Sequence, residues 1–213
     1  PDWLLGADTG RLFRSFIRPN DGNQPDTYGG HYWLNPNGCS PSRQNDNCGV
    51  HINSGVQNYW FYLLSVGGSG TNDHGDPFDI DPIGIDKAAA IAYRNLTVYL
   101  NRSSNFNDAR NGAIQSAIDL YGENSEEERQ VTNAWYAVGV GEPFVEPGTI
   151  DKLVLVNAQA DQDIQDLTDG MVIDLVDLPT VELNVRAEAS TGSKSVQFAL
   201  TGPMDHTVTT NTE

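Results

Sequence analysis

The sequence has 213 residues, of which 38% are hydrophobic, and it carries 29 acidic against 12 basic side chains, a formal net charge of −17. This acidity argues against a nucleic-acid partner, because neutralising phosphates requires clustered lysine and arginine. No apolar run reaches the roughly eighteen residues of a membrane-spanning helix, so none is predicted.

Charge and composition change near residue 147. Residues 1–147 carry 9 basic and 18 acidic side chains, whereas the shorter segment 148–213 carries 3 and 11. We therefore expect a first domain over 1–144, a linker over 145–150 and a second domain over 151–213. The opening PDWLLGADTG lacks the basic and apolar regions of a signal peptide, so we expect the native N-terminus to lie elsewhere.

Residues 1–49 are predicted to form a long loop, because they are dense in Gly, Pro, Asn and Asp. Loops of this length are uncommon in compact domains unless they serve a function. Cys39 and Cys48 lie nine residues apart in it and can close a small disulfide ring; two free thiols are the alternative. A single cysteine pair is a poor zinc site. A disulfide favours an oxidising compartment and hence a secreted protein.

Apolar residues at three-and-four spacing then predict an α-helical bundle over residues 50–140. Its helices are expected at 50–68, 85–101, 107–122 and 126–141, and several end at glycine, a common helix terminator. Ser125 followed by Glu128 predicts a capping box, in which each side chain satisfies a free backbone N–H at the helix start.

Beyond the linker, apolar residues recur with the two-residue period of β-strands. We expect strands at 152–159, 170–178, 181–189 and 195–200, since short apolar or alternating runs there are separated by Gly, Pro, Asp and Ser. Such strands are typical of part of a β-sandwich. No closing strand is evident before Glu213, so we expect this module to be truncated.

The segment NDNCGVHINSG, residues 45–55, concentrates reactive side chains. His51 can donate a hydrogen bond to developing negative charge if a partner fixes its tautomer, and Asp46 lies at the right spacing to be that partner. The alternative is that the two residues only satisfy each other at a helix start. Spacing alone favours this second interpretation.

Two further sets of residues allow a functional and an ordinary interpretation. Arg14 can hold a carbonyl or carboxylate through two N–H groups, or it can be a solvated surface charge. Calcium could bind the acidic segment with Asp73, Asp76, Asp79 and Asp81, but this segment does not match the EF-hand pattern, so a solvated acidic loop is favoured. The sequence contains no H-E-x-x-H, G-x-S-x-G or Walker motif.

Five motifs in order resemble the C-terminal helical lobe of thermolysin-like zinc metallopeptidases: DNCGVHINSG, FYLLSVGG, IGIDKAAAIAYRNLTVYL, SNFNDAR with IQSAIDLYG, and NAWYAVGVG. The resemblance extends from Pro1 to about Gly141. It implies that His51 stabilises the oxyanion of the tetrahedral intermediate and that Asp46 orients it. It also implies that Arg14 holds the substrate carbonyl, with Phe13 beside it in the pocket.

The same resemblance places the zinc ligands, H-E-x-x-H and a third glutamate, before Pro1. Zinc is therefore the expected cofactor, held by a missing N-terminal half, and this chain alone should bind no catalytic zinc and cleave nothing. Protein or peptide substrates are expected, with a preference for bulky apolar residues after the cleaved bond.

Departures from the family pattern concern calcium and the cysteines. The resemblance implies a double calcium site held partly by acidic residues near PDW. Asp2 remains as its candidate ligand, but Leu4 and Ala7 stand where carboxylates are expected, so that site should be weakened or missing. The Cys39–Cys48 ring is absent from the archetype, and we hypothesise that it braces the loop carrying Asp46 in place of an ion.

Two other hypotheses compete with an enzyme half. The chain could be a stand-alone binding or adhesion module with a relic peptidase lobe, or a degenerate homologue without activity. The joint presence of His51, Asp46 and Arg14 favours the enzyme.

Overall fold

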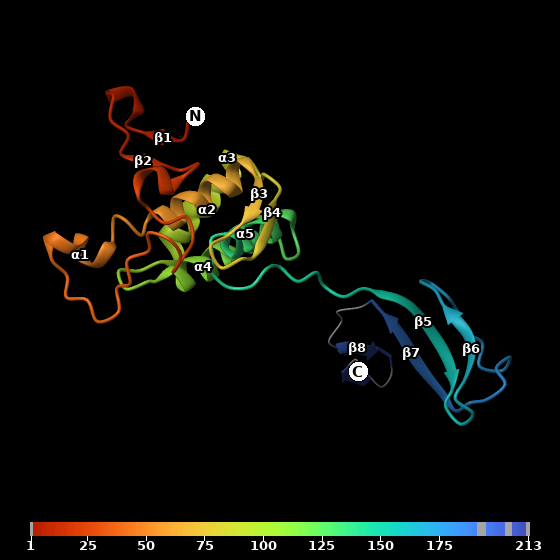
Figure 1. The fold of residues 1–213 in the computed structure, drawn as a ribbon. Coiled ribbons are helices and arrows are strands. Elements are labelled where there is room, and N and C mark those ends of the chain that lie inside the picture. The colour runs from red at the N-terminus through yellow and green to blue at the C-terminus, as the bar shows by residue number, and fades with distance from the viewer. Residues whose placement is uncertain (1, 191–194, 203–205, 212–213) are drawn as a thin grey trace. The chain divides into compact units, whose positions relative to one another are not determined.

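The computed structural model describes residues 2–190, 195–202 and 206–211, and the chain divides into two compact units, Pro1–Phe144 and Val145–Glu213 (Figure 1). The first is mainly helical and the second is built from strands. The predicted fold class, a helical lobe followed by a partial β module, is confirmed.

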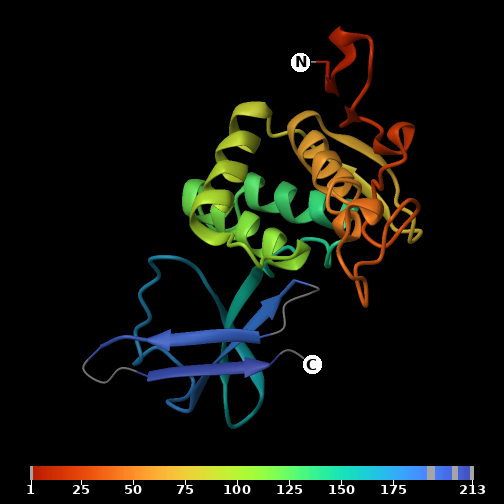
Figure 2. The same cartoon turned by 90° about the vertical axis from the view of Figure 1, so that its left-hand side faces the viewer.

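The helical unit contains α2 (Gly55–Val66), α3 (Ile85–Arg94), α4 (Phe106–Tyr121) and α5 (Glu126–Ala137), and α3 continues into a π-helical turn at Asn95–Tyr99. Helix α5 packs against both α2 and α4, and Figure 2 shows it in green at the centre of this unit. Trp60 of α2 and Trp135 of α5 are buried and stack with ring centroids 4.9 Å apart. The three alanines on the buried face of α4, Ala109, Ala113 and Ala117, are small enough for close helix packing.

A β-hairpin lies between the first two helices of the bundle, where the sequence predicted an acidic loop. Strand β3 (Gly68–Thr71) pairs antiparallel with β4 (Pro77–Ile80), so these two strands were missed. The Gly-Ser-Gly-Thr sequence of β3 has no apolar alternation that could have indicated a strand. The acidic segment lies in this hairpin, and Asp79 belongs to β4. Oδ2 of Asp73 accepts the backbone N–H of His31 (2.6 Å).

The expected long loop 1–49 contains short elements. Strand β1 (Leu4–Leu5) pairs with β2 (Arg14–Ser15), and 3₁₀ turns occupy Ala7–Thr9, Pro19–Gly22 and Arg43–Asn45. They are followed by the four-residue α1 (Asp46–Gly49).

The start of α5 differs slightly from the predicted capping box. Oγ of Ser125 accepts the backbone N–H of Glu128 (3.2 Å), as expected, but the Glu128 carboxylate accepts the N–H of Asn124 (2.6 Å) instead of that of Ser125. Three glutamates in the first turn, Glu126 to Glu128, also suit the positive end of the helix dipole.

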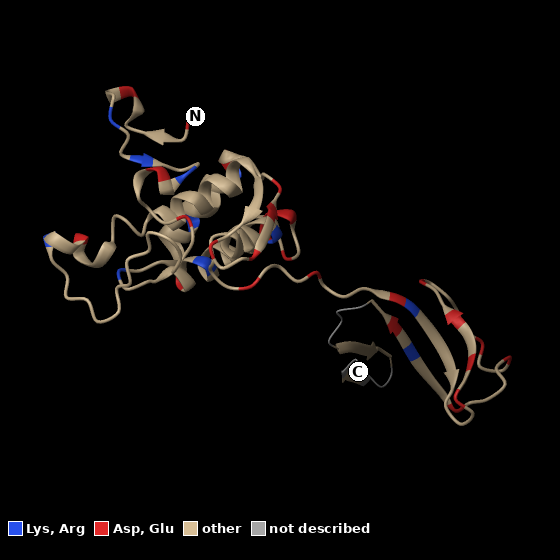
Figure 3. Ribbon diagram, viewed as in Figure 1, with Lys and Arg blue, Asp and Glu red and all other residues tan. Residues whose placement is uncertain are grey.

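In the second unit, antiparallel strands form two sheets within the described residues. The order of the first is β6 (Gln162–Leu167), β5 (Ile150–Asn157), β7 (Leu183–Ala189), and the second pairs β8 (Ser195–Leu200) with β9 (His206–Asn211). Val154, Leu155 and Val156 of the central strand are buried. Acidic residues, red in Figure 3, are spread along this sheet. Two cross-strand ion pairs, Lys152–Asp166 (2.9 Å) and Arg186–Asp163 (2.8 Å), offset some of their charge.

The strand predictions differ from the structure at three places in this unit. Residues 170–178 form no strand: Asp174 accepts the backbone N–H of Val176 through its side chain (3.0 Å) and that of Asp177 through its carbonyl (3.2 Å), and this turn exposes Val172 and Val176. Strand β6 was missed because its QDIQDL sequence is polar, and it forms by pairing with β5. A closing strand was not expected, yet β9 pairs with β8.

Candidate active site

A left-handed turn precedes His51 and carries Asp46. The φ angles of Asp46, Asn47 and Cys48 are 55°, 49° and 67°, and Gly49 follows at 84°. Each non-glycine residue in this conformation costs about 1–2 kcal/mol, so consecutive examples require restraints from their surroundings. Asp and Asn tolerate the conformation better than other residues, and Gly49 tolerates it freely.

The restraints come from a disulfide and an asparagine. Cys39 and Cys48 are joined, which closes the predicted ring. The side-chain oxygen of Asn45 accepts the backbone N–H groups of Cys48 (3.1 Å) and Ser42 (2.9 Å). The left-handed turn is thus held at Cys48, two residues from Asp46.

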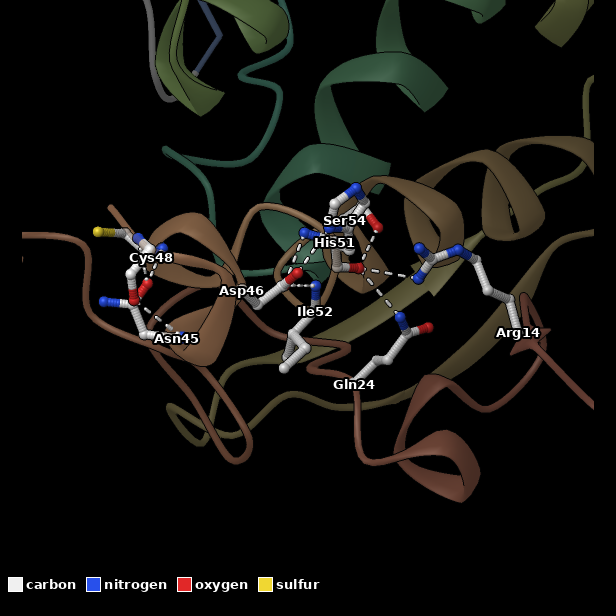
Figure 4. Close-up of polar contacts among 9 residues, drawn as sticks. Arg14, Gln24, Asn45, Asp46, Cys48, His51, Ile52 and Ser54 are labelled. Atoms are coloured by element: carbon white, nitrogen blue, oxygen red, sulfur yellow. Dashed lines mark hydrogen bonds and ion pairs between the residues drawn. The ribbon is translucent and has the colours of Figure 1, made fainter. Parts of the chain in front are cut away.

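The turn brings the Asp46 carboxylate to His51 (Figure 4). Oδ1 lies 2.5 Å from Nδ1 of the imidazole, and Oδ2 accepts the backbone N–H groups of His51 and Ile52, each at 2.9 Å. The hydrogen bond to the His51 ring is the main cause of a lowered pKa of Asp46. Asp46 therefore remains ionised, which orients the ring and favours a proton on Nδ1.

The imidazole itself is open to its surroundings. The His51 side chain is 69% exposed, whereas the Asp46 side chain is 23% exposed. The arrangement leaves the far edge of the ring accessible to another molecule.

The backbone carbonyl of His51 is held as well. Within the described residues it accepts hydrogen bonds from Oγ of Ser54 (2.7 Å), Nη1 of Arg14 (2.8 Å) and Nε2 of Gln24 (3.1 Å) (Figure 4). Arg14 thus lies beside His51, and one of its N–H groups is engaged by the protein. Gln24 belongs to no sequence motif, and its contribution could not be predicted from spacing because it lies 27 residues from His51.

Phe13 adjoins Arg14 and presents an apolar surface. Its side chain is 56% exposed, and the guanidinium of Arg11 lies 5.5 Å from the ring centroid. Exposed phenylalanine is consistent with a surface that contacts an apolar group, although a single exposed ring is common on proteins.

The described residues do not form a zinc site. Among residues 2–190, 195–202 and 206–211, no group of three or more His, Cys, Asp or Glu side chains could hold a metal ion. Asp2 is exposed, and its Oδ1 accepts the backbone N–H of Leu4 (3.2 Å). In the same part of the chain, no helix is long and apolar enough to cross a membrane.

The family model of the thermolysin metallopeptidase alpha-helical domain matches residues 1–140, about two thirds of the 213 residues. The chain belongs to the thermolysin metallopeptidase family. The resemblance read from the five motifs is thereby confirmed. This thermolysin-family domain coincides closely with the helical unit, Pro1–Phe144.

Several relatives are about equally similar to the thermolysin-family chain. A bacillolysin of Bacillus cereus is 40% identical over 146 residues, which cover 66% of this chain and 23% of the relative. The thermostable neutral protease NprT of Geobacillus stearothermophilus and a thermolysin of Alicyclobacillus acidocaldarius subsp. acidocaldarius are each 39% identical over 146 residues, covering 66% of this chain and 24% of the relative. The chain spans less than a quarter of the length of these relatives.

Proposed function

We propose that this chain supplies the oxyanion-stabilising and substrate-positioning half of a secreted zinc metalloendopeptidase. The observation that carries the proposal is the exposed imidazole of His51, oriented by Asp46 through Nδ1 and held at its backbone N–H and carbonyl. Family membership supplies the reaction class, because thermolysin-type relatives are metallopeptidases.

The chemistry follows from where charge develops during peptide hydrolysis. Attack of water on the scissile carbonyl places negative charge on its oxygen, and a fixed hydrogen-bond donor stabilises that charge. In this role Nε2 of His51 carries a proton and donates to that oxygen, while the Nδ1–H stays on Asp46.

Arg14 and Phe13 are the substrate-binding residues of the proposal. Arginine carries five N–H groups in a planar fork, so the bond from Nη1 to the His51 carbonyl leaves donors for a substrate carbonyl. The exposed ring of Phe13 would contact an apolar substrate side chain. Both residues adjoin or belong to β2.

Zinc must come with another part of the protein, because the described residues contain no cluster that fits it. Bound zinc would supply activated water, and its ligands would lie in an N-terminal half that this chain lacks. We infer that the 213-residue chain alone is inactive. Calcium remains a proposal limited to Asp2, which would need ligands from that same missing half.

The test compares the full-length protein with the 213-residue chain in hydrolysis of casein and of a short peptide. We expect the full-length protein to cleave both, to lose activity with a zinc chelator and to regain it with added zinc, while the chain alone shows no activity. Zinc-independent cleavage, or chelator-sensitive cleavage by the chain alone, would overturn the proposal. A full-length protein that cleaves nothing would favour the alternative of a binding module.

A further inference from the structure

We propose that Gln24 is a positioning residue for the candidate oxyanion stabiliser, acting through the backbone carbonyl of His51. This inference rests on the proposed function of His51. Gln24 is 6% exposed, and its Nε2 donates to the His51 carbonyl oxygen at 3.1 Å. Its hydrogen bond is to the backbone of His51 and not to the ring, so its action would be indirect.

Gln24 completes a set of hydrogen bonds that holds both the backbone N–H and the backbone carbonyl of His51. Asp46 accepts the backbone N–H of His51 (2.9 Å), while Gln24, Arg14 and Ser54 donate to its carbonyl. With both peptide planes fixed, the bond from Nδ1 to Asp46 sets the remaining side-chain rotation. A small displacement of a catalytic hydrogen-bond donor lowers the reaction rate, because the donor must lie within hydrogen-bond distance of the substrate oxygen as negative charge develops on it.

The fold brings Gln24 to this position through a close approach at Gly55. A Cβ atom added to Gly55 would lie 2.4 Å from the carbonyl oxygen of Pro25 and 2.9 Å from Cβ of Gln24. Only glycine at the first position of α2 therefore lets the Gln24–Pro25 segment lie against the helix start. This close approach places the side-chain amide of Gln24 within hydrogen-bond distance of the His51 carbonyl.

Packing alone does not explain an amide at position 24. Its Oε1 is buried without a hydrogen-bond partner among the described residues. Burying an unpaired polar atom is unfavourable, and an apolar side chain of similar shape would avoid it. The bond from Nε2 to His51 is the interaction that accounts for the amide.

Gln130 provides a matched control. This glutamine of α5 is 4% exposed, and it bonds to the backbone N–H of Asp81 (3.1 Å) and the carboxylate of Glu126 (2.6 Å), away from His51. Replacing it with methionine should lower stability without changing catalysis. Gln24→Met is the corresponding change at the proposed positioning residue.

The experiment is a double-mutant cycle on the full-length zinc-loaded protein, with kcat and KM measured for a short peptide. We expect Gln24→Met to lower kcat about tenfold with KM little changed, and to have no further effect in a His51→Ala background. Gln130→Met should leave kcat unchanged. Gln24→Leu also removes the donor with a shorter apolar side chain, so it should lower kcat as Gln24→Met does, and it replaces that variant if methionine prevents folding.

Three results would overturn the inference: an unchanged kcat in Gln24→Met or Gln24→Leu, an equal fall in Gln130→Met, or a loss that adds fully to that of His51→Ala. Failure of the proposed function gives a different result. In that case His51→Ala itself leaves kcat unchanged.

Discussion

Oδ1 of Asp46 lies 2.5 Å from Nδ1 of His51, while its Oδ2 accepts two consecutive backbone N–H groups. One carboxylate thus fixes both the ring and the backbone of the candidate oxyanion stabiliser. Asp46→Asn removes the charge beside the ring and converts one of the two acceptors into a donor. We expect kcat of the full-length enzyme to fall about 10–100-fold, in the range seen when partners that orient catalytic ligands are removed.

The check for Asp46 is steady-state kinetics with zinc content measured in parallel. Asp46→Glu keeps the charge but lengthens the side chain, so it should retain more activity than Asp46→Asn if charge dominates. Full activity in Asp46→Asn with normal zinc content would contradict the orienting role.

The Cys39–Cys48 disulfide should stabilise the helical unit through the left-handed turn. Removing a ring of this size costs about 2–3 kcal/mol in the chain-entropy model. Cys48 also adopts a positive φ of 67°, which glycine adopts freely and alanine does not. We therefore expect Cys39→Ala/Cys48→Gly to be more stable than Cys39→Ala/Cys48→Ala, by about 1 kcal/mol.

Denaturant unfolding of both double variants and of Cys39→Ser measures these differences. A Cys39→Ser protein with unchanged thermal stability would refute the bracing role of the ring. Equal stability of the glycine and alanine variants would refute the left-handed conformation of Cys48.

Asp119 should make the helical unit sensitive to acid. Hydrogen bonds from the hydroxyl of Tyr99, from Arg94 (2.6 and 2.9 Å) and from Gln115 (3.1 Å) lower the pKa of Asp119 to about 2. A carboxylate whose pKa is depressed on folding stabilises the protein above its unfolded pKa, and this contribution disappears as pH falls through the folded pKa. For Asp119 the window runs from the ordinary carboxyl pKa of 3.8 down to about 2.

Melting temperatures of the wild type and Asp119→Asn, taken across that window, isolate this contribution from other carboxylates. We expect the wild type to be the more stable at about pH 5 and the difference to shrink towards zero near pH 2. A difference that stays constant with pH would show that the charge of Asp119 is not responsible.

We also propose that residues 1–144 and 151–213 fold as separate domains joined by the segment 145–150. The division into Pro1–Phe144 and Val145–Glu213 supports this proposal, and residues 145–149 have no helix or strand. Limited proteolysis should cut first in this segment and leave a stable helical fragment. Initial cleavage within α2 to α5 would contradict it.

Much of the helical fold could be predicted because the buried apolar residues recur at the period of an α-helix. Val56, Trp60, Leu63 and Leu64 line the buried side of α2 at helical spacing, and glycines end α2 and α4 near the predicted positions. The sheets were harder to predict, since β6 and β9 are polar strands stabilised by their partners. The apolar run at 170–178 pairs with no strand among the residues that the structure describes.

The candidate site was only partly accessible from sequence. His51, Asp46 and Arg14 could be named from motifs, but the left-handed turn between Asp46 and Gly49 has no apolar pattern, and Gln24 depends on a tertiary approach at Gly55. Spacing identifies residues that are near in the chain. It does not predict which distant side chains donate to one carbonyl.

The most direct test of the account is kcat of His51→Ala in the full-length zinc-loaded protein. Loss of one donor to a developing oxyanion lowers kcat by about 10²–10³, so we expect a fall of this size with zinc content and KM little changed. An unchanged kcat at full zinc occupancy would contradict the account, because His51 would then have no part in stabilising the transition state.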